Sequence, residues 1–388
     1  MFSSRLPEDR APTRLARALA DARRRGGLVD LTLSNPTRAG IRYPPHLLDA
    51  LADPASLAYR PEPFGLAEAR AAVAGIYQAR GLRLDRERIV LTASTSEAYS
   101  TLFKLLCEPG QSDVLTPVPS YPLFDHLARL DGVTQRRYAL EYHGAWTVDT
   151  ASIDRAWTTC TRAVLAVSPN NPTGSALHAA DAAELVERCR QRQAALIVDE
   201  VFHDYPLAGP LEEPSPLQSP PCLLARLGGL SKTVGLPQLK LGWMALDGPP
   251  DLVAEALDRI ELIADTYLSV STPVQVAARA VLRDGGTVRA AILERVTGNL
   301  ATLARLVASS RSVTLLPAEG GWSAVLRVPA TRSEEELAIE LLERDRVAVH
   351  PGYFFDFPHE AFLVISLLPE PAPFAAGVER ILGRADAA

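Results

Sequence analysis

Short apolar runs alternate with helix-like segments through much of the chain. Each run has only about four to six residues, which is too short for a helix but fits a strand that is buried on both faces. Segments of helical character, such as Ser96–Leu106 and Ala179–Arg192, lie between them. The runs are Ile89–Thr92, Asp113–Thr116, Ala163–Val167 and Ala195–Val198. This alternation predicts an α/β fold, a three-layer αβα core around a mostly parallel central sheet.

A different pattern begins after about residue 275, where long helical stretches are followed by short strands. The expected strands are Val313–Leu316, Ser323–Val328, Val347–His350 and Phe362–Leu367. They predict a second, smaller α+β domain. We expect an N-terminal segment over residues 1–40 that packs with the small domain, a large domain over 41–270 and a small domain over 271–388. A chain of 388 residues is long enough for two such domains.

The composition narrows the classes of function. Apolar residues make up 47% of the chain and charged residues 22%, which is typical of a globular protein. A net charge of −6 provides no overall positive field, so we expect no nucleic acid and no membrane as partner. The four cysteines form no CxxC pair, and we expect neither a metal site nor a disulfide framework. The first ten residues lack the apolar core of a signal peptide, which favours a cytoplasmic location.

Three polar segments lie at or near the ends of expected strands, where parallel sheets gather ligand-binding groups. They are Ser168–Gly174 with the sequence SPNNPTG, Ile197–Phe202 with an Asp-Glu pair, and Leu230–Lys232. Each has an ordinary explanation when taken alone. The first fits a turn before a helix, the second a solvated strand end, and the third a surface lysine.

The order and spacing of the three segments are more specific. NNPTG is followed about 30 residues later by Asp199-Glu200, and about 30 residues further by Ser231-Lys232, with Gly242-Trp243 beyond. This arrangement resembles the class I/II aminotransferases, which are fold-type I enzymes that use pyridoxal 5′-phosphate (PLP), and the resemblance extends over roughly residues 29–385. It implies a PLP cofactor, an amino donor and a keto acid or carbonyl acceptor as substrates, and a homodimer.

The resemblance also implies roles for single residues. Lys232 would form the Schiff base with the cofactor and later move the proton between the substrate Cα and the cofactor. Asp199 would pair with the pyridine nitrogen and keep it protonated, so that the ring accepts electrons released at Cα. Asn171 would donate its amide to the ring oxygen. Tyr121, in the loop Pro119–Pro122, would lie on the face of the ring, although a tyrosine in a proline turn is the alternative.

The phosphate of the cofactor would lie at the start of a helix. Backbone N–H groups of Ser94 and Thr95 would face it, at the positive end of the helix dipole. The family commonly has Gly at the position of Ser94, which a serine with negative φ can also occupy. Ser231 would lie in the cofactor site, and Tyr59 resembles the tyrosine that reaches the phosphate of the neighbouring subunit.

The chain departs from the family pattern at four positions. Phe202 replaces the tyrosine that hydrogen-bonds the ring oxygen, and Gly229 replaces a phosphate-binding serine. Lys240 stands where the family has an arginine, keeping the charge but losing the bidentate fork. Val364 stands where the family generally has the arginine that binds the α-carboxylate of the substrate. Either another residue binds that carboxylate, or the substrate is not a plain α-amino acid.

Arg38 is a candidate for that missing contact. It follows Ser34 and Asn35 in a loop that the resemblance places at the mouth of the active site, so all three are candidate substrate residues. The alternative is that Arg38 is a solvated surface arginine.

Two other functions remain open at this point. One is a different PLP reaction on the same fold, such as a β-lyase, decarboxylase or racemase, because Lys232 and Asp199 serve all of these chemistries. The other is a PLP-sensing regulatory module of a transcription factor. Such a module would need a preceding DNA-binding domain, and only about 28 residues come before the first expected strand.

Overall fold

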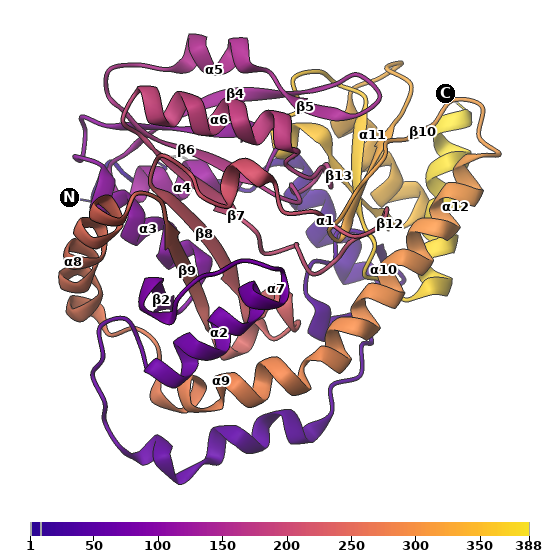
Figure 1. The fold of residues 1–388 in the computed structure, drawn as a ribbon. Helices are drawn as coiled ribbons and strands as arrows, with labels where there is room; N and C mark the ends of the chain where they lie inside the picture. Colours follow the sequence, from indigo (N-terminus) through magenta and orange to yellow (C-terminus); the bar gives the residue numbers. More distant parts are fainter. Residues whose placement is uncertain (1, 8–9, 388) are drawn as a thin grey trace.

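An eight-stranded sheet forms the centre of the molecule in the computed structural model, which describes residues 2–7 and 10–387 (Figure 1). Its strands are β2 (Ile89–Thr92), β3 (Asp113–Val118), β4 (Thr134–Tyr142), β5 (Trp146–Val148), β6 (Thr161–Val167), β7 (Ala195–Asp199), β8 (Leu224–Gly229) and β9 (Gly242–Asp247). They lie in the order β2-β9-β8-β7-β6-β3-β4-β5. The five strands from β8 to β4 are parallel, while β9 and β5 are antiparallel to their neighbours. The expected mostly parallel sheet is confirmed.

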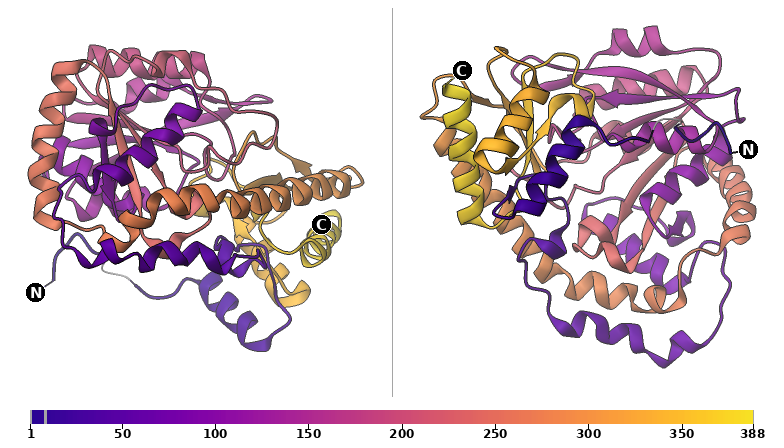
Figure 2. Two further views of the ribbon diagram at one scale, coloured as in Figure 1. Left: turned by 60° about the horizontal axis from the view of Figure 1, so that its bottom comes forward. Right: turned by 180° about the vertical axis from the view of Figure 1, so that it is seen from behind.

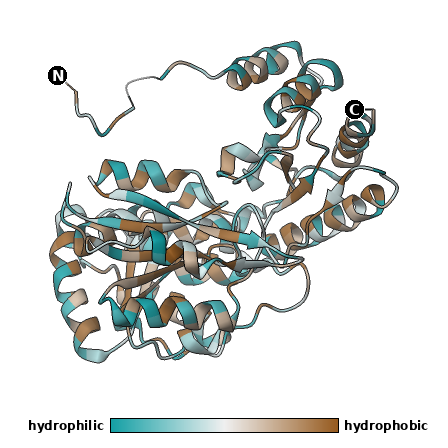
Figure 3. Cartoon of the chain, turned by 90° about the horizontal axis from the view of Figure 1, so that it is seen from above, coloured by the Kyte–Doolittle hydropathy of each residue, from teal (hydrophilic) through white to brown (hydrophobic). Residues whose placement is uncertain are grey.

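Helices cover both faces of this sheet. On one face α3 (Thr95–Leu106), α4 (Leu123–Leu130) and α8 (Pro250–Tyr267) pack against Ala195 and Ile197 of β7. On the other face α5 (Thr150–Ala156) and α6 (Ala179–Gln191) belong to one apolar cluster with Leu196 and Val198 of β7. Because successive side chains of a strand point to opposite faces, a strand covered on both sides must be apolar throughout. Figure 3 shows this distribution, with brown strands inside and teal on the outer faces of the helices.

A smaller unit lies beside the large sheet, with the N-terminal segment next to it (Figure 2). Its four-stranded sheet has the order β10-β11-β14-β13, and β1 pairs with β12 in a separate two-stranded sheet. The strands are β1 (Val29–Asp30), β10 (Thr314–Leu315), β11 (Ser323–Arg327), β12 (Val347–Ala348), β13 (His350–Pro351) and β14 (Phe362–Ser366). The single strand expected at Val347–His350 is therefore two strands that join different sheets.

The remaining helices connect and cover these units. They are α1 (Arg14–Arg25), α2 (Ala67–Ala79), α7 (Leu230–Thr233), α9 (Thr272–Asp284), α10 (Gly286–Val307), α11 (Glu334–Glu340) and α12 (Pro371–Asp386). α1 packs on the small unit through Ala22, which contacts Leu342 and Ala348. α2 and α9 pack on the β2–β9 end of the large sheet, and α10 packs in the core of the small unit. The domain limits expected near residues 40 and 270 stay a prediction.

None of the helices in residues 2–7 and 10–387 has both the length and the apolar character that are required to cross a membrane.

Candidate active site

A cavity of about 200 Å³ lies where the parallel strands of the large sheet end and the small unit begins. The ends of β6 and β7 contribute Val167 and Asp199, and the segment after β8 contributes Ser231 and Lys232. The small unit and the N-terminal segment close the other side. The side chains there are Thr32, Ser34, Trp322, Ser323, His350, Phe355, Val364, Ser366 and Leu368.

Lys232 places a buried amine in this cavity. It lies on the short helix α7, and the hydroxyl of Tyr205 donates to its carbonyl oxygen at 2.6 Å, which fixes the backbone. The amine nitrogen lies 4.6 Å from the ring centre of Trp322 and 5.4 Å from that of Phe202. Burial lowers the pKa of Lys232 to about 8, while the nearby Asp199 acts in the opposite direction. Part of this amine is therefore neutral near physiological pH, as a nucleophile requires.

Asp199 is the only carboxylate that lines the cavity among the described residues. Its Oδ1 accepts a hydrogen bond from the backbone N–H of Val201 at 3.1 Å, and its Oδ2 accepts one from the hydroxyl of Tyr99 at 3.0 Å. Burial raises the pKa of Asp199 to about 6, and both hydrogen bonds oppose that rise. The carboxylate is thus held in one orientation and remains mostly ionised at neutral pH.

The two asparagines of the SPNNPTG segment have different partners. The side-chain oxygen of Asn170 accepts from the hydroxyl of Ser120 at 2.7 Å, and its amide donates to the carbonyl oxygen of Pro119 at 3.0 Å. Asn170 therefore joins this loop to the loop that carries Tyr121. Asn171 lines the cavity, and its side-chain oxygen accepts from the hydroxyl of Ser323 at 3.3 Å. That contact leaves the amide N–H groups of Asn171 to donate within the cavity.

The N-terminus of α3 also faces the cavity. Ser94 is extended, with φ −167°, and its hydroxyl accepts from the N–H of Glu97 at 3.2 Å. The next N–H groups, in the first turn, have no acceptor within the helix and suit an anion. Gly242 on β9 lies so close that a Cβ there would come within 2.8 Å of the carbonyl carbon of Ser94. This close approach explains the glycine of the Gly-Trp pair in the sequence pattern.

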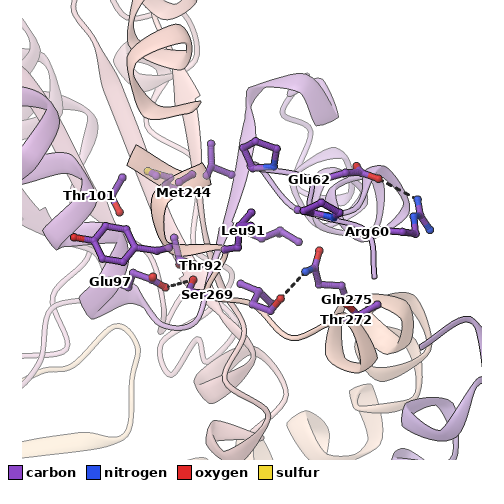
Figure 4. A pocket seen from close by; sticks show the side chains of 18 of the residues that line it. Arg60, Glu62, Leu91, Thr92, Glu97, Thr101, Met244, Ser269, Thr272 and Gln275 are labelled. Atoms are coloured by element: carbon purple, nitrogen blue, oxygen red, sulfur yellow. Dashed lines mark hydrogen bonds and ion pairs between the residues drawn. The ribbon is translucent and has the colours of Figure 1, made fainter. Parts of the chain in front are cut away.

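Nine of the thirteen candidate site residues line this cavity: Ser34, Ser94, Thr95, Tyr121, Asn171, Asp199, Phe202, Ser231 and Lys232. Four lie elsewhere. Arg38 and Lys240 are exposed, and Asn35 uses its side chain to accept from Thr37 at the start of a short helix. Tyr59 is 78% exposed and lines a separate pocket beside Glu97 and Ser269, which Figure 4 shows. The proposed role of every one of these residues stays a prediction.

Other side chains in or beside the cavity were not anticipated. Tyr99 occupies a core position in the apolar pattern of its helix. Its neighbours in the sequence do not predict that its hydroxyl contacts Asp199. Trp322, Ser323 and His350 lie in the small unit, roughly 90 residues or more beyond Lys232, and belong to no motif. A tryptophan directly after two glycines, Gly320 and Gly321, was the one available signal.

These groups fit PLP as their cofactor. Lys232 is a buried amine with no ion-pair partner among the described residues, and can bind an aldehyde covalently. Asp199 suits a protonated pyridine nitrogen, and the start of α3 suits a phosphate. Asn171 offers a donor to the ring oxygen, whereas Phe202 offers none.

Comparisons with known proteins agree with this geometry. The model of the family "Aminotransferase class I and II" matches residues 28–381. An alanine aminotransferase of Mycobacterium tuberculosis strain H37Rv is 26% identical over 367 residues, which cover 91% of this chain and 84% of that protein. Glutamate-pyruvate aminotransferase AlaA of Escherichia coli K12 is 27% identical over 353 residues, covering 88% and 86%.

The solved structure of an alanine aminotransferase from Pyrococcus furiosus shares the fold, with a TM-score of 0.90 at 20% identity and full coverage of both chains. The family match extends over most of the sequence, and members of the family depend on PLP. The chain belongs to the class I and II aminotransferases and is a PLP-dependent enzyme that transfers an amino group from a donor to a keto acid or another carbonyl acceptor.

Proposed function

We propose that Lys232 is the residue that binds the cofactor covalently and that it moves the proton at the substrate Cα. Asp199 holds the pyridine nitrogen in its protonated form, and Tyr99 orients Asp199. Asn171 donates to the ring oxygen, Tyr121 covers the ring, and Ser94, Thr95 and Ser231 surround the phosphate. The bound cofactor supplies the electron sink for the transfer.

The observation that carries this proposal is the shared cavity of Lys232 and Asp199. A buried amine whose pKa is lowered to about 8 and a buried carboxylate whose pKa is raised to about 6 open into the same space. Groups with shifted pKa values in one cavity are typical of catalytic sites. Near neutral pH the carboxylate is mostly charged and part of the amine is neutral, which are the two states that these roles require.

Replacement of Lys232 tests the assignment directly. The chain has only three lysines, Lys104, Lys232 and Lys240. Borohydride treatment of the cofactor-loaded protein should fix the cofactor mass on the peptide that contains Lys232, and Lys232→Ala should abolish that modification. Lys104→Ala is the matched control and should retain it, because Lys104 pairs with Asp131 and has no role in the proposed site. Modification of Lys104 or Lys240 in the Lys232→Ala protein would show that the assignment is wrong.

We also propose that the enzyme is a homodimer. Large apolar side chains are exposed around the pocket of Figure 4 and on the adjoining helix, including Leu57 (91% exposed), Tyr59 (78%), Leu262 (74%) and Tyr267 (60%). This pocket and the Lys232 cavity both reach the first turn of α3, because Glu97 lines one and Ser94 the other. A partner that covers these side chains would complete the surroundings of both sites.

We propose a cytoplasmic location on the grounds of the sequence. The cysteines Cys107, Cys160, Cys189 and Cys222 are all unpaired, which agrees with a reducing compartment. Fractionation of the source cells, with the chain followed by antibody, tests this location.

A further inference from the structure

The side of the cavity that faces away from the large sheet combines apolar side chains with polar groups that carry no charge. Four hydroxyl groups line it, from Thr32, Ser34, Ser323 and Ser366. Val364 and Ser366 line it from the same strand, β14, because residues two apart share a face. These side chains offer hydrogen bonds to a substrate without offering a charge.

The imidazole of His350 belongs to the same wall and is neutral. Burial lowers the pKa of His350 to about 4, although the nearby Asp30 acts in the opposite direction. His350 pairs with Val364 in the sheet and stacks on Phe354 with a ring-centre distance of 4.7 Å. It therefore adds a neutral donor or acceptor to the wall at physiological pH.

Among the residues that the structure describes, no arginine lines the cavity, and its only charged side chains at neutral pH are Lys232 and Asp199. Both are committed to the cofactor in the proposed function. Arg295 comes near but is held away, since its Nη1 donates to the carbonyl oxygens of Ala39 and Leu368 at 2.8 and 3.1 Å. Arg38 is exposed on its loop.

An ionised carboxylate would be poorly accommodated against this wall. A charge that leaves water for a partly closed site needs an opposite charge or several free donors. Two of the four hydroxyls already donate elsewhere, Thr32 to Asp30 and Ser323 to Asn171. The charged group beside Thr32 is instead an anion, because Asp30 accepts from the N–H and the hydroxyl of Thr32 at 3.0 and 2.5 Å. A neutral hydroxyl on the substrate would bind to the same side chains without that cost.

We propose that the preferred amino donor is a primary amine whose amino carbon carries no carboxylate, and specifically an amino alcohol. This inference rests on the proposed roles of Lys232 and Asp199. The hydroxyl of the donor lies against Ser366, Ser323 and His350, with its carbon chain toward Val364 and Leu368. The product of the donor is the corresponding hydroxy-ketone or hydroxy-aldehyde.

The reaction balances without any further reagent. The C–N bond of the donor breaks while its carbon is oxidised by two electrons to a carbonyl, whose oxygen comes from water. The carbonyl carbon of the acceptor is reduced by the same two electrons, gains the C–N bond and loses its oxygen as water, so no water is consumed overall. The nitrogen and the electron pair pass through the bound cofactor, so the exchange consumes one amine and one carbonyl compound and releases one of each.

Matched pairs of donors test the inference with the cofactor-loaded enzyme. The pairs are alanine and alaninol, leucine and leucinol, and phenylalanine and phenylalaninol, each as both enantiomers. Conversion of the bound cofactor from its aldehyde to its amine form is followed by absorbance without acceptor. We expect the alcohol of the best pair to react with at least about tenfold higher kcat/KM than the acid. Equal or faster reaction of the acid in every pair overturns the inference.

Binding gives a second readout that does not depend on turnover. 2-Amino-2-methylpropan-1-ol and 2-aminoisobutyrate lack a proton on the amino carbon and cannot complete the transfer. Calorimetric titration of the loaded enzyme should give a dissociation constant that is at least about tenfold lower for the alcohol. Tighter binding of the acid contradicts the proposal.

Val364→Arg should shift the preference toward the acid. The side chain at this position lines the cavity next to Ser366, so an arginine there brings a guanidinium to the neutral wall. The ratio of kcat/KM for acid over alcohol should rise at least about tenfold. Val364→Met is the control of similar bulk without charge and should leave the ratio unchanged. An unchanged ratio in a folded, cofactor-loaded Val364→Arg protein overturns the placement of the substrate against β14.

The outcomes separate this inference from the proposed function. Faster reaction of amino acids, with the cofactor on Lys232, leaves the proposed function intact and overturns the inference alone. Cofactor on a different lysine overturns the proposed function and the inference with it. If Val364→Arg does not fold, the parent enzyme still decides the question through the matched pairs and the calorimetry.

Discussion

The amine of Lys232 should be unusually reactive for a lysine. Because burial lowers its pKa from 10.5 to about 8, the neutral form becomes dominant above pH 8. In cofactor-free protein, labelling of Lys232 by a small amine-reactive probe should rise through a midpoint near pH 8. Peptide mass spectrometry measures this, with the exposed Lys240 as reference in the same digest. A midpoint above pH 10 would show that the amine is not buried as described.

The hydroxyl of Tyr99 should stabilise the folded chain more strongly when Asp199 is ionised than when it is protonated. Its hydroxyl donates to Oδ2 of Asp199, so Tyr99→Phe should raise the pKa of this carboxyl further above about 6. The folded variant then holds its proton to higher pH than the unfolded chain, so its stability falls more steeply as the pH rises through that range. We expect a loss of about 1–2 kcal/mol at pH 8 and a smaller loss at pH 5, from urea unfolding of cofactor-free protein.

Tyr138→Phe is a matched control for this effect. Tyr138 is equally buried, but its hydroxyl donates to the neutral carbonyl oxygen of Leu165 at 2.8 Å. The cost of its removal should therefore be nearly the same at pH 5 and pH 8. If Tyr99→Phe behaves in the same way, the hydrogen bond to Asp199 does not tune its charge.

At the scale of residues, the sequence revealed the large-sheet side of the site better than the opposite wall. Lys232, Asp199 and Asn171 follow buried strands in recognisable patterns, because a strand end and its loop fix the positions of contiguous residues. His350 and Ser323 reach the cavity only through the packing of two separate sheets. Nothing adjacent in sequence marks such residues, since their role depends on contacts between distant segments.

At the scale of elements, the approach of α3 to β9 should control cofactor affinity. Gly242→Ala would place a Cβ 2.8 Å from the carbonyl carbon of Ser94 and 3.0 Å from the nitrogen of Thr95, displacing the helix N-terminus. Loss of one hydrogen bond to the charged phosphate costs about 1.5–3 kcal/mol, so the dissociation constant for PLP should rise roughly tenfold to a hundredfold. Equilibrium dialysis measures this change.

Gly298→Ala provides the control for that substitution. Gly298 lies in α10, where an alanine Cβ would have no other atom within 4 Å, and alanine favours a helix by up to about 1 kcal/mol over glycine. This variant should keep its PLP affinity and gain slightly in thermal stability. Equal weakening of PLP binding in both variants would rule out a specific effect at the α3 N-terminus.

The elements that the sequence predicted poorly are those at the margins of the sheets. The buried strands β2, β3, β6 and β7 were expected because most of their residues are apolar. β4 was not, since its first half carries polar and charged side chains that are mostly exposed near the edge of the sheet. The division between β12 and β13 also escaped prediction, because pairing partners rather than composition separate them.

At the scale of the whole molecule, association should depend on the exposed apolar side chains near the pocket of Figure 4. Leu262→Glu on α8 should weaken the dimer in sedimentation velocity without unfolding the chain, because this side chain is 74% exposed. A stable dimer buries about 800 Å² per partner, and a charge within such an area is costly. Leu252→Glu, near the other end of the same helix, is the control.

A parent protein that sediments as a monomer, or a Leu262→Glu protein that associates as strongly as its parent, would contradict the proposed surface. Activity at high dilution gives an independent check. If both sites need the partner, specific activity should fall as the dimer dissociates.

The split of residues 347–351 between two sheets ties the N-terminal segment to the cavity wall opposite the large sheet. β1 pairs with β12, and the carbonyl oxygen of Leu31 accepts from the N–H of Ser366 at 2.7 Å, while β13 carries His350. Thr32 and Ser34 follow directly. To change donor selectivity by exchanging segments with a related enzyme, residues 29–34 and residues 347–366 must therefore be replaced together. Such an exchange leaves Lys232 and its helix α7 untouched, so selectivity can be redesigned while the chemistry stays in place.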